Sequence, residues 1–202
     1  MEQNLDQPTT ETVLPPETET EKQNFGAVLL DILETLLLSV VLFLIINAVS
    51  ARVRVEGSSM EPSFHDGEFV IVSRLDYRFG YPDYGDVVVF HYPGNPEEEY
   101  IKRVVGGPND HVRIVDGTVL VNGMMLTEPY VQAEPAYTGE WDVPEDHIFV
   151  LGDNRNNSSD SHSWGPLPME NVIGRAVFVY WPLRDWGSIK SVDPLAVSVS
   201  QP

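Results

Sequence analysis

The strongest constraint on the fold is an unbroken run of 17 uncharged residues, 35–51, dominated by Leu, Val and Ile. About 17 to 25 such residues cross a bilayer as a helix. Residues 25–33 extend the apolar pattern upstream, where Asp31 and Glu34 interrupt it, and we expect these two carboxylates near the lipid headgroups. The sequence therefore predicts one transmembrane anchor over residues 25–51.

A cleaved signal peptide is the alternative interpretation, because Ala48-Val49-Ser50 offers small residues at the spacing that cleavage requires. Signal peptides begin with a short positive stretch and have an apolar core of about 7 to 15 residues. Residues 1–24 are instead acidic, with Lys22 as their single cation. We therefore expect a retained anchor and, over residues 1–24, a disordered tail with too few large apolar groups to bury. The small-residue triplet also raises the hypothesis of slow self-cleavage.

Beyond Arg52 the apolar pattern changes to a period of two, which is typical of strands separated by short turns. Asp116-Gly117 and Asn122-Gly123 favour tight hairpins, and nothing longer than a turn is expected to be helical. Residues 52–202 are therefore predicted to form one mostly β domain, an antiparallel curved sheet or partly open barrel. The expected strands are Val53–Glu56, Glu68–Val72, Asp86–Phe90, Ile101–Val105, His111–Val115, Thr118–Val121, Ile148–Leu151 and Ile173–Tyr180, with an acidic hairpin tip at 93–99 and a loop or small β extension at 130–144.

Composition excludes several classes of function. The net charge of -19 repels phosphate backbones, so nucleic acid is not an expected partner. The chain has no cysteine, which removes disulfides, zinc thiolate sites and thiol catalysis together. We expect no metal and no cofactor.

A serine and a lysine are the candidate catalytic residues. Ser59 lies in a turn just before Pro62, where a hydroxyl can project into a cleft, although most serines in turns only shape the turn. Lys102 is the only one of three lysines that falls in a predicted strand. If it faces inward, burial disfavours the ammonium and lowers its pKa, and the neutral amine can then take the proton of a serine hydroxyl. A lysine that snorkels at a strand edge is the alternative.

A third polar segment, residues 152–161, follows a predicted strand. Its oxygen-rich side chains would suit a cation, but the spacing is not that of an EF-hand. With Gly57-Ser58-Ser59-Met60-Glu61-Pro62-Ser63, Gly85–Phe90 and Tyr100–Gly106, this segment resembles the bacterial type I signal peptidases, a family of serine-lysine peptidases. The resemblance extends from the anchor to about residue 181, and the order and spacing of the four segments together are specific.

The resemblance implies a role for each matching residue. Ser59 would attack the scissile carbonyl, and Lys102 would act as general base and later protonate the leaving amine. Ser158 would hold the lysine, and the backbone N–H of Ser59 would stabilise the oxyanion. The supporting polar network would consist of Asp153, Arg155 and Asp160.

Two positions depart from the family pattern. Some members carry an oxyanion-binding serine where this chain has Gly57, so the second donor is absent or comes from elsewhere. Many carry an arginine where this chain has His162. Because histidine titrates near neutrality, we hypothesise that His162 makes the network around Asp160 sensitive to pH.

The resemblance also implies the substrate and the topology. Exported preproteins would be cut after small residues, bound as a strand along an enzyme edge. The residues expected to line shallow apolar pockets are Val55, Met60, Phe64, Tyr100 and Ile101. The chain would act as a monomer in the cell membrane, with a cytoplasmic tail, one span, bilayer contact and an extracytoplasmic catalytic domain. Arg52 and Arg54 after the anchor weakly favour the opposite orientation, which we note as a conflict.

Three alternatives differ in their chemistry. A Ser-His-Asp hydrolase would pair Ser59 with a histidine such as His65 or His162, but no nucleophile elbow is present. A self-cleaving serine-lysine regulator is closer, yet the anchor and the lack of a DNA-binding segment speak against it. A non-enzymatic, membrane-tethered β module would need only the fold.

Overall fold

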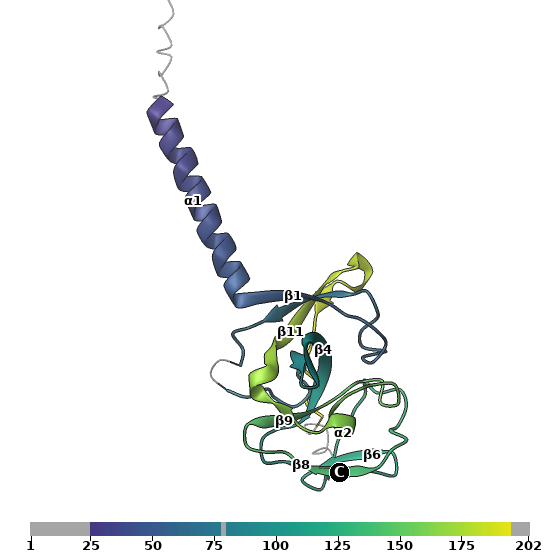
Figure 1. Ribbon diagram of the computed structural model, residues 1–202. Coiled ribbons are helices and arrows are strands. Elements are labelled where there is room, and N and C mark those ends of the chain that lie inside the picture. The colour runs from purple at the N-terminus through teal and green to yellow at the C-terminus, as the bar shows by residue number, and fades with distance from the viewer. Residues whose placement is uncertain (1–24, 78–79, 195–202) are drawn as a thin grey trace, which may run out of the picture. The chain divides into compact units, whose positions relative to one another are not determined.

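The computed structural model describes residues 25–77 and 80–194 (Figure 1). The predicted acidic tail, residues 1–24, lies outside these ranges. The chain divides into two compact units, residues 1–42 and 43–202, and each is described by itself.

One long helix, α1, spans Phe25–Val49 and is strongly apolar. Among the described residues it is the single helix that is long and apolar enough to cross a membrane. The hydroxyls of Thr35 and Ser39 donate to backbone carbonyls one turn earlier, at 2.8 and 2.7 Å, so these polar groups are satisfied within the helix. The helix ends two residues before the predicted anchor does, because Ser50 and Ala51 belong to the first strand.

The remaining elements are almost all strands, joined in antiparallel pairs. The main sheet has the order β1-β2-β11-β3-β4-β9-β10, with β12 beside β11, and it does not close into a barrel. Strand β4, which carries Lys102, thus lies between β3 and β9. The bounds are β1 Ser50–Arg54, β2 Phe69–Ser73, β3 Val87–Tyr92, β4 Asn95–Gly106, β9 His147–Leu151, β10 Leu167–Pro168, β11 Val172–Trp181 and β12 Gly187–Ser188.

A second, smaller sheet has the order β7-β6-β5-β8 (Figure 1). Its strands are β5 His111–Val115, β6 Thr118–Val121, β7 Met124–Met125 and β8 Gly139–Asp142. Positive φ angles at Asp116, Gly117, Asn122 and Gly123 form the two tight turns that the sequence predicts. The predicted extension at 130–144 contains β8.

The prediction of a mostly antiparallel β domain is confirmed, with local differences. The expected tip at 93–99 is only a turn at Pro93 and Gly94, because residues 95–99 continue β4. Three single turns of helix also occur in the described part of the domain: α2 Ser161–Trp164, η1 Met169–Asn171 and η2 Leu183–Asp185.

The central strands are buried on both faces, which determines the environment of their polar side chains. On β3, Val87 and Val89 pack into one apolar cluster, whereas Val88 and Phe90 pack into another. On β4, Ile101 joins the first cluster and Val104 the second. A charged side chain on this part of β4 is therefore desolvated whichever way it points.

The small-residue triplet 48–50 lies within regular structure. Ala48 and Val49 close α1, and Ser50 pairs with Ser73 of β2. The Arg74 N–H donates to the Val49 carbonyl at 2.9 Å. Self-cleavage at this triplet stays a hypothesis, and it requires both elements to open first.

Candidate active site

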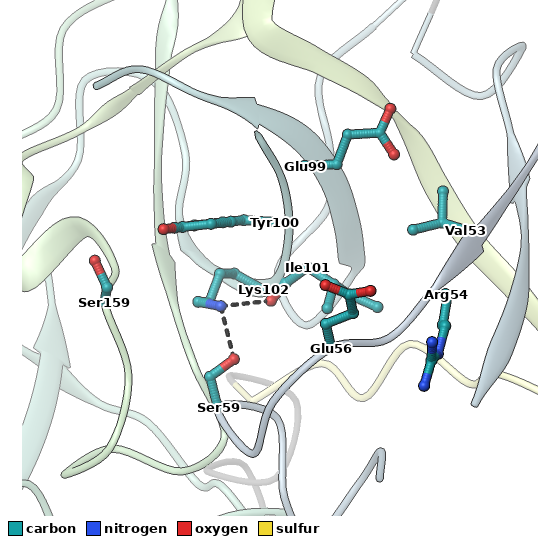
Figure 2. A pocket seen from close by; sticks show the side chains of 9 residues that line it. All are labelled: Val53, Arg54, Glu56, Ser59, Glu99, Tyr100, Ile101, Lys102 and Ser159. Atoms are coloured by element: carbon teal, nitrogen blue, oxygen red, sulfur yellow. Dashed lines mark hydrogen bonds between the residues drawn. The ribbon is translucent and has the colours of Figure 1, made fainter. Parts of the chain in front are cut away.

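Lys102 is held inside the domain by the pleat of β4. Its backbone pairs with Val88 of β3, and its side chain is only 3% exposed. The Nζ atom lies 2.8 Å from Ser59 Oγ and 2.8 Å from the Ile101 carbonyl oxygen, to which it donates (Figure 2). No ion pair within the described ranges includes Lys102, so a buried cation here lacks a contacting counter-charge.

Burial lowers the pKa of Lys102 from 10.5 to about 8, and the more distant negative charges of Asp160 and Asp153 oppose this shift without cancelling it. Near pH 8 about half of the molecules therefore carry a neutral amine. A neutral Nζ has a lone pair, and at 2.8 Å it can accept the proton of the Ser59 hydroxyl. The pair has the geometry and the protonation state that a nucleophile and its general base require.

The Ser59 turn is fastened to the polar segment 152–161. The Ser59 carbonyl accepts from the Asn154 N–H at 3.0 Å, and the Asn154 side-chain amide donates to the Ser58 carbonyl at 3.1 Å. Asn157 Nδ2 donates to Ser58 Oγ at 2.8 Å. The Ser59 turn is therefore positioned by residues almost a hundred positions later in the chain.

One backbone donor beside the nucleophile is unused. The N–H of Ser59 makes no hydrogen bond with any described residue, which leaves it for an oxyanion. Gly57 has a φ of +80°, and its own N–H donates to Asp66. Gly57 suits this turn because its positive φ is unfavourable for other residues, and it offers no side-chain hydroxyl as a second oxyanion donor.

Ser158 lies close to the nucleophile but does not hold the lysine in this structure. Its Oγ is buried and has no hydrogen-bond partner among the described residues. A Cβ placed on Gly152 would lie 2.3 Å from that Oγ and 2.5 Å from the Ser59 carbonyl oxygen, so only glycine permits this packing. The bond expected from Ser158 to Lys102 is replaced by the bond from Lys102 to the Ile101 carbonyl.

Asp153 pairs with a residue that the sequence analysis left out. Arg103, next to the catalytic lysine, donates Nε and Nη2 to the two Asp153 oxygens at 2.8 and 2.6 Å. Its Nη1 donates to the Gly85 carbonyl, and its guanidinium lies 4.0 Å from the centre of the Tyr130 ring. The signal was available, because an arginine in the middle of a buried apolar strand needs a carboxylate partner.

Arg155 does not join Asp153 as expected. It forms a two-pronged pair with Glu128, and its Nε donates to the Gly152 carbonyl at 3.2 Å. Glu128 lies in the long connection between β7 and β8, where nothing in the sequence marks it as a partner. Asp153 and Arg155 therefore belong to two separate buried ion pairs.

Asp160 stabilises the same segment from its far end. Its carboxylate accepts from the Gly152 N–H at 2.9 Å and from the His162 N–H at 3.1 Å. His162 Nδ1 lies 2.6 Å from Asp160, and the ring stacks on Tyr137 with 4.0 Å between ring centres. The histidine thus occupies the position of an ionic partner to Asp160, as the sequence analysis proposed.

The alternative of a Ser-His-Asp hydrolase would require a histidine bonded to Ser59. His65 bonds to Glu68 and His162 to Asp160, and neither bonds to Ser59. In the ranges that the structure describes, no group of three or more His, Asp or Glu side chains is placed to hold a metal ion.

A cavity of about 210 Å³ opens over the serine and the lysine (Figure 2). Tyr100 and Ile101 line it as expected, but Val55, Met60 and Phe64 are buried in the core instead and are absent from its wall. The residues that line the cavity are Val53, Arg54, Glu56, Ser59, Glu99, Tyr100, Ile101, Lys102 and Ser159.

The fold and the site together define a β-sheet peptidase with a serine-lysine pair. The family model described as signal peptidase, peptidase S26, matches residues 29–181. The chain is 40% identical to "Signal peptidase I" of Leptolyngbya laminosa, over 94% of this chain and 97% of that one. It is 42% identical to "Probable signal peptidase I-2" of Synechocystis, over 76% and 74% of the two chains.

The chain belongs to the signal peptidase family, peptidase S26. It is therefore a peptide-bond hydrolase. A crystal structure of a signal peptidase I from Enterococcus faecalis is also similar, with a TM-score of 0.43 and 30% identity, over 47% of this chain and 96% of that one.

Proposed function

We propose that the protein is a membrane-anchored serine endopeptidase that removes signal peptides from exported preproteins, with Ser59 as nucleophile and Lys102 as general base. The observation that carries the proposal is the 2.8 Å contact between Ser59 Oγ and a buried lysine that has no ion-pair partner in the described part of the chain. Membership of the signal peptidase family supports the substrate class.

In the first half-reaction, neutral Lys102 takes the Ser59 proton while Oγ attacks the carbonyl carbon of the scissile bond. The negative charge on the tetrahedral oxygen is met by the free N–H of Ser59. The C–N bond then breaks as the Lys102 ammonium returns its proton to the leaving amine. Water, deprotonated by Lys102 in turn, hydrolyses the acyl-enzyme and releases Ser59.

The cavity wall supports the proposed selection of small side chains. Val53, Tyr100 and Ile101 offer apolar surface close to Ser59 Oγ and Lys102 Nζ. A substrate strand that enters here would place small side chains against this wall.

Membrane attachment and topology are also part of the proposal. The helix α1 supplies the anchor. A separate apolar patch, formed by Trp181, Leu183 and Trp186, is 52 to 67% exposed and suits contact with a bilayer surface. We place the catalytic domain on the extracytoplasmic face of the cell membrane, where a preprotein presents its cleavage site, and expect it to act as a monomer.

The direct test uses the full chain in detergent and a preprotein with an Ala-x-Ala site. Wild type is expected to cut after the second alanine, as product masses would show. Ser59→Ala and Lys102→Ala each lose a reacting group, so the rate should fall about 10⁴-fold or more. The matched controls Ser188→Ala and Lys190→Ala, both exposed and outside the cavity, should retain the wild-type rate.

Each alternative gives a different result. Equal cleavage by wild type, Ser59→Ala and Lys102→Ala would assign the chemistry to other residues. No cleavage by any of them would favour a non-enzymatic β module.

A further inference from the structure

The catalytic cavity continues into a second hollow of about 530 Å³ that leads away from Ser59. The two hollows share Val53, Arg54, Glu56, Glu99 and Tyr100. We call the charged part of this continuous surface the charged groove, and it consists of Arg52, Arg54, Glu56, Glu97, Glu98 and Glu99. Any peptide that reaches Ser59 along this path passes all six side chains.

The charges of the groove are not used by the fold. None of the six residues takes part in an ion pair among the described residues, although both signs are present. Glu98 accepts from the Asn95 amide and the Tyr100 hydroxyl, which fixes its position without neutralising it. These charges are therefore free to act on a bound peptide.

The groove also has the backbone edges that an extended peptide needs. Strand β1 pairs only with β2, and β4 pairs with β9 only from Arg103 onward. The stretch of β4 from Glu99 to Lys102 thus pairs with β3 on one edge and has one unpaired edge, as has β1, and Glu97 and Glu98 are in register with neither neighbouring strand. Both strands border the hollow. A peptide bound there as a strand would advance at about the same spacing per residue as β4 itself.

This spacing relates positions on the peptide to positions on the groove. For a peptide strand that runs parallel to β4, with the residue cut at Ser59 level with Lys102, the residue three earlier in the peptide lies level with Glu99, and the residue five earlier lies level with Glu97. Figure 2 shows Glu56 and Glu99 on the side of the cavity away from Ser159. The fourth to sixth residues before the scissile bond therefore meet the charged groove.

We propose that the charged groove selects preproteins that carry Lys or Arg four to six residues before the scissile bond, an inference that rests on the proposed function. The groove has four carboxylates and two guanidiniums, so its sum is negative. A cationic side chain on the peptide is attracted to this surface, and an anionic one is repelled. The apolar residues of the cavity wall, Val53, Tyr100 and Ile101, contact the side chains next to the cut, whereas the charged groove selects for charge.

The test uses three peptides that share an Ala-x-Ala site and differ only in the fifth residue before the bond, which is Lys, Gln or Glu. For the full-length protein in neutral detergent at low salt, kcat/KM should fall in the order Lys, Gln, Glu, with about a three- to tenfold ratio between Lys and Glu. At 0.5 M salt the ratio should shrink toward one, because screening acts on exposed charges.

Variants separate the groove from the general acidity of the protein. Glu97→Gln/Glu99→Gln should reduce the ratio of the Lys to the Glu peptide to less than twofold. The control Glu145→Gln/Glu170→Gln removes the same charge at exposed positions outside the groove and should keep the wild-type ratio.

The outcomes distinguish this inference from the proposed function. Equal rates for the three peptides, a preference for Glu, or equal reduction of the ratio by both double variants would overturn the inference and leave the peptidase intact. Failure of wild type to cut the Gln peptide at the Ala-x-Ala bond would instead overturn the proposed function, and the inference with it.

Discussion

The two faces of β4 carry neighbouring buried cations in opposite states. Lys102 and Arg103 are 3% and 4% exposed, so both side chains have lost their water. Arg103 meets a carboxylate, Asp153, through two hydrogen bonds, whereas Lys102 Nζ contacts a hydroxyl, a carbonyl and, at 5.2 Å from its centre, the Tyr100 ring, but no described carboxylate. Burial lowers the pKa of the lysine to about 8.

The contrast shows how one strand combines a structural and a reactive cation. A buried charge with a full set of partners is fixed, and a buried charge without a counter-ion is ready to lose its proton. Arg103 and Asp153 stabilise the strand and the segment after β9, and Lys102 works against folding in its charged form. Three substitutions test this division.

The largest expected effect comes from removing the paired cation. Arg103→Met leaves Asp153 buried and unpaired, so the free energy of unfolding should fall by about 3 to 5 kcal/mol. Urea unfolding of the full chain in detergent, followed by tryptophan fluorescence, measures it. The control Arg113→Met removes an exposed arginine from β5 and should cost less than about 0.5 kcal/mol. Similar losses from both variants would show that the Arg103 pair is not special.

For Lys102→Met we expect a smaller change in the free energy of unfolding, and of the opposite sign. Because its pKa in the folded protein is about 8 and its ordinary value is 10.5, the unfolded chain binds more protons between these pH values. The penalty is complete below pH 8 and disappears as the pH rises to about 10.5. Lys102→Met should therefore raise the free energy of unfolding at pH 7 by about 1 to 3 kcal/mol, with the gain shrinking toward pH 10.5.

The same urea titrations at several pH values measure this gain. Lys190→Met, at an exposed position, is the matched control and should show no such dependence on pH. A loss of stability in Lys102→Met would mean that the lysine is a structural cation like its neighbour.

The smallest effect concerns His162. The kcat/KM of wild type should rise with pH through an apparent pKa near 8, since the neutral Lys102 is the base. Asp160 raises the pKa of Lys102, and a histidine is ordinarily neutral at pH 8, whereas an arginine would offset the carboxylate at every pH. His162→Arg should thus lower the apparent pKa by a few tenths of a unit and speed cleavage at pH 7 about twofold.

A pH profile of cleavage for the two proteins decides the question. An unchanged or raised apparent pKa in His162→Arg would disprove the role of His162. The substitution Ser163→Ala next to it is a control for disturbance of α2, and it leaves the charges in place.

The sequence predicted the anchor helix and the antiparallel β domain, because each follows from a local period, but it left open whether Lys102 faces inward or lies at a strand edge. The burial of β4 on both faces could not be predicted from a local period. It depends on segments far away in the chain, which also supply Ser59 and Asp153 as partners of Lys102 and Arg103. The hydrogen bond from the Asn154 N–H to the Ser59 carbonyl could not be predicted from a local sequence pattern either. The residue types identified Lys102 as a candidate base and Ser59 as a candidate nucleophile, and only the fold shows that the two side chains are in contact.

The pocket residues show the same limit more clearly. Val55, Met60 and Phe64 are near Ser59 in the sequence, so proximity suggested that they line the cleft. They are apolar and the turn brings them against β2 and β3, where they are needed in the core. Residues that are polar or come from the far strand, such as Glu56 and Glu99, form the cavity wall instead.

The place of β11 between β2 and β3 determines when the enzyme can become active. A chain growing from its N-terminus has made Ser59 and Lys102 long before Trp181, but the sheet that holds them side by side has a gap until its last long strand arrives. The contact between Ser59 and Lys102 therefore depends on a strand that is complete only when nearly the whole chain has been made.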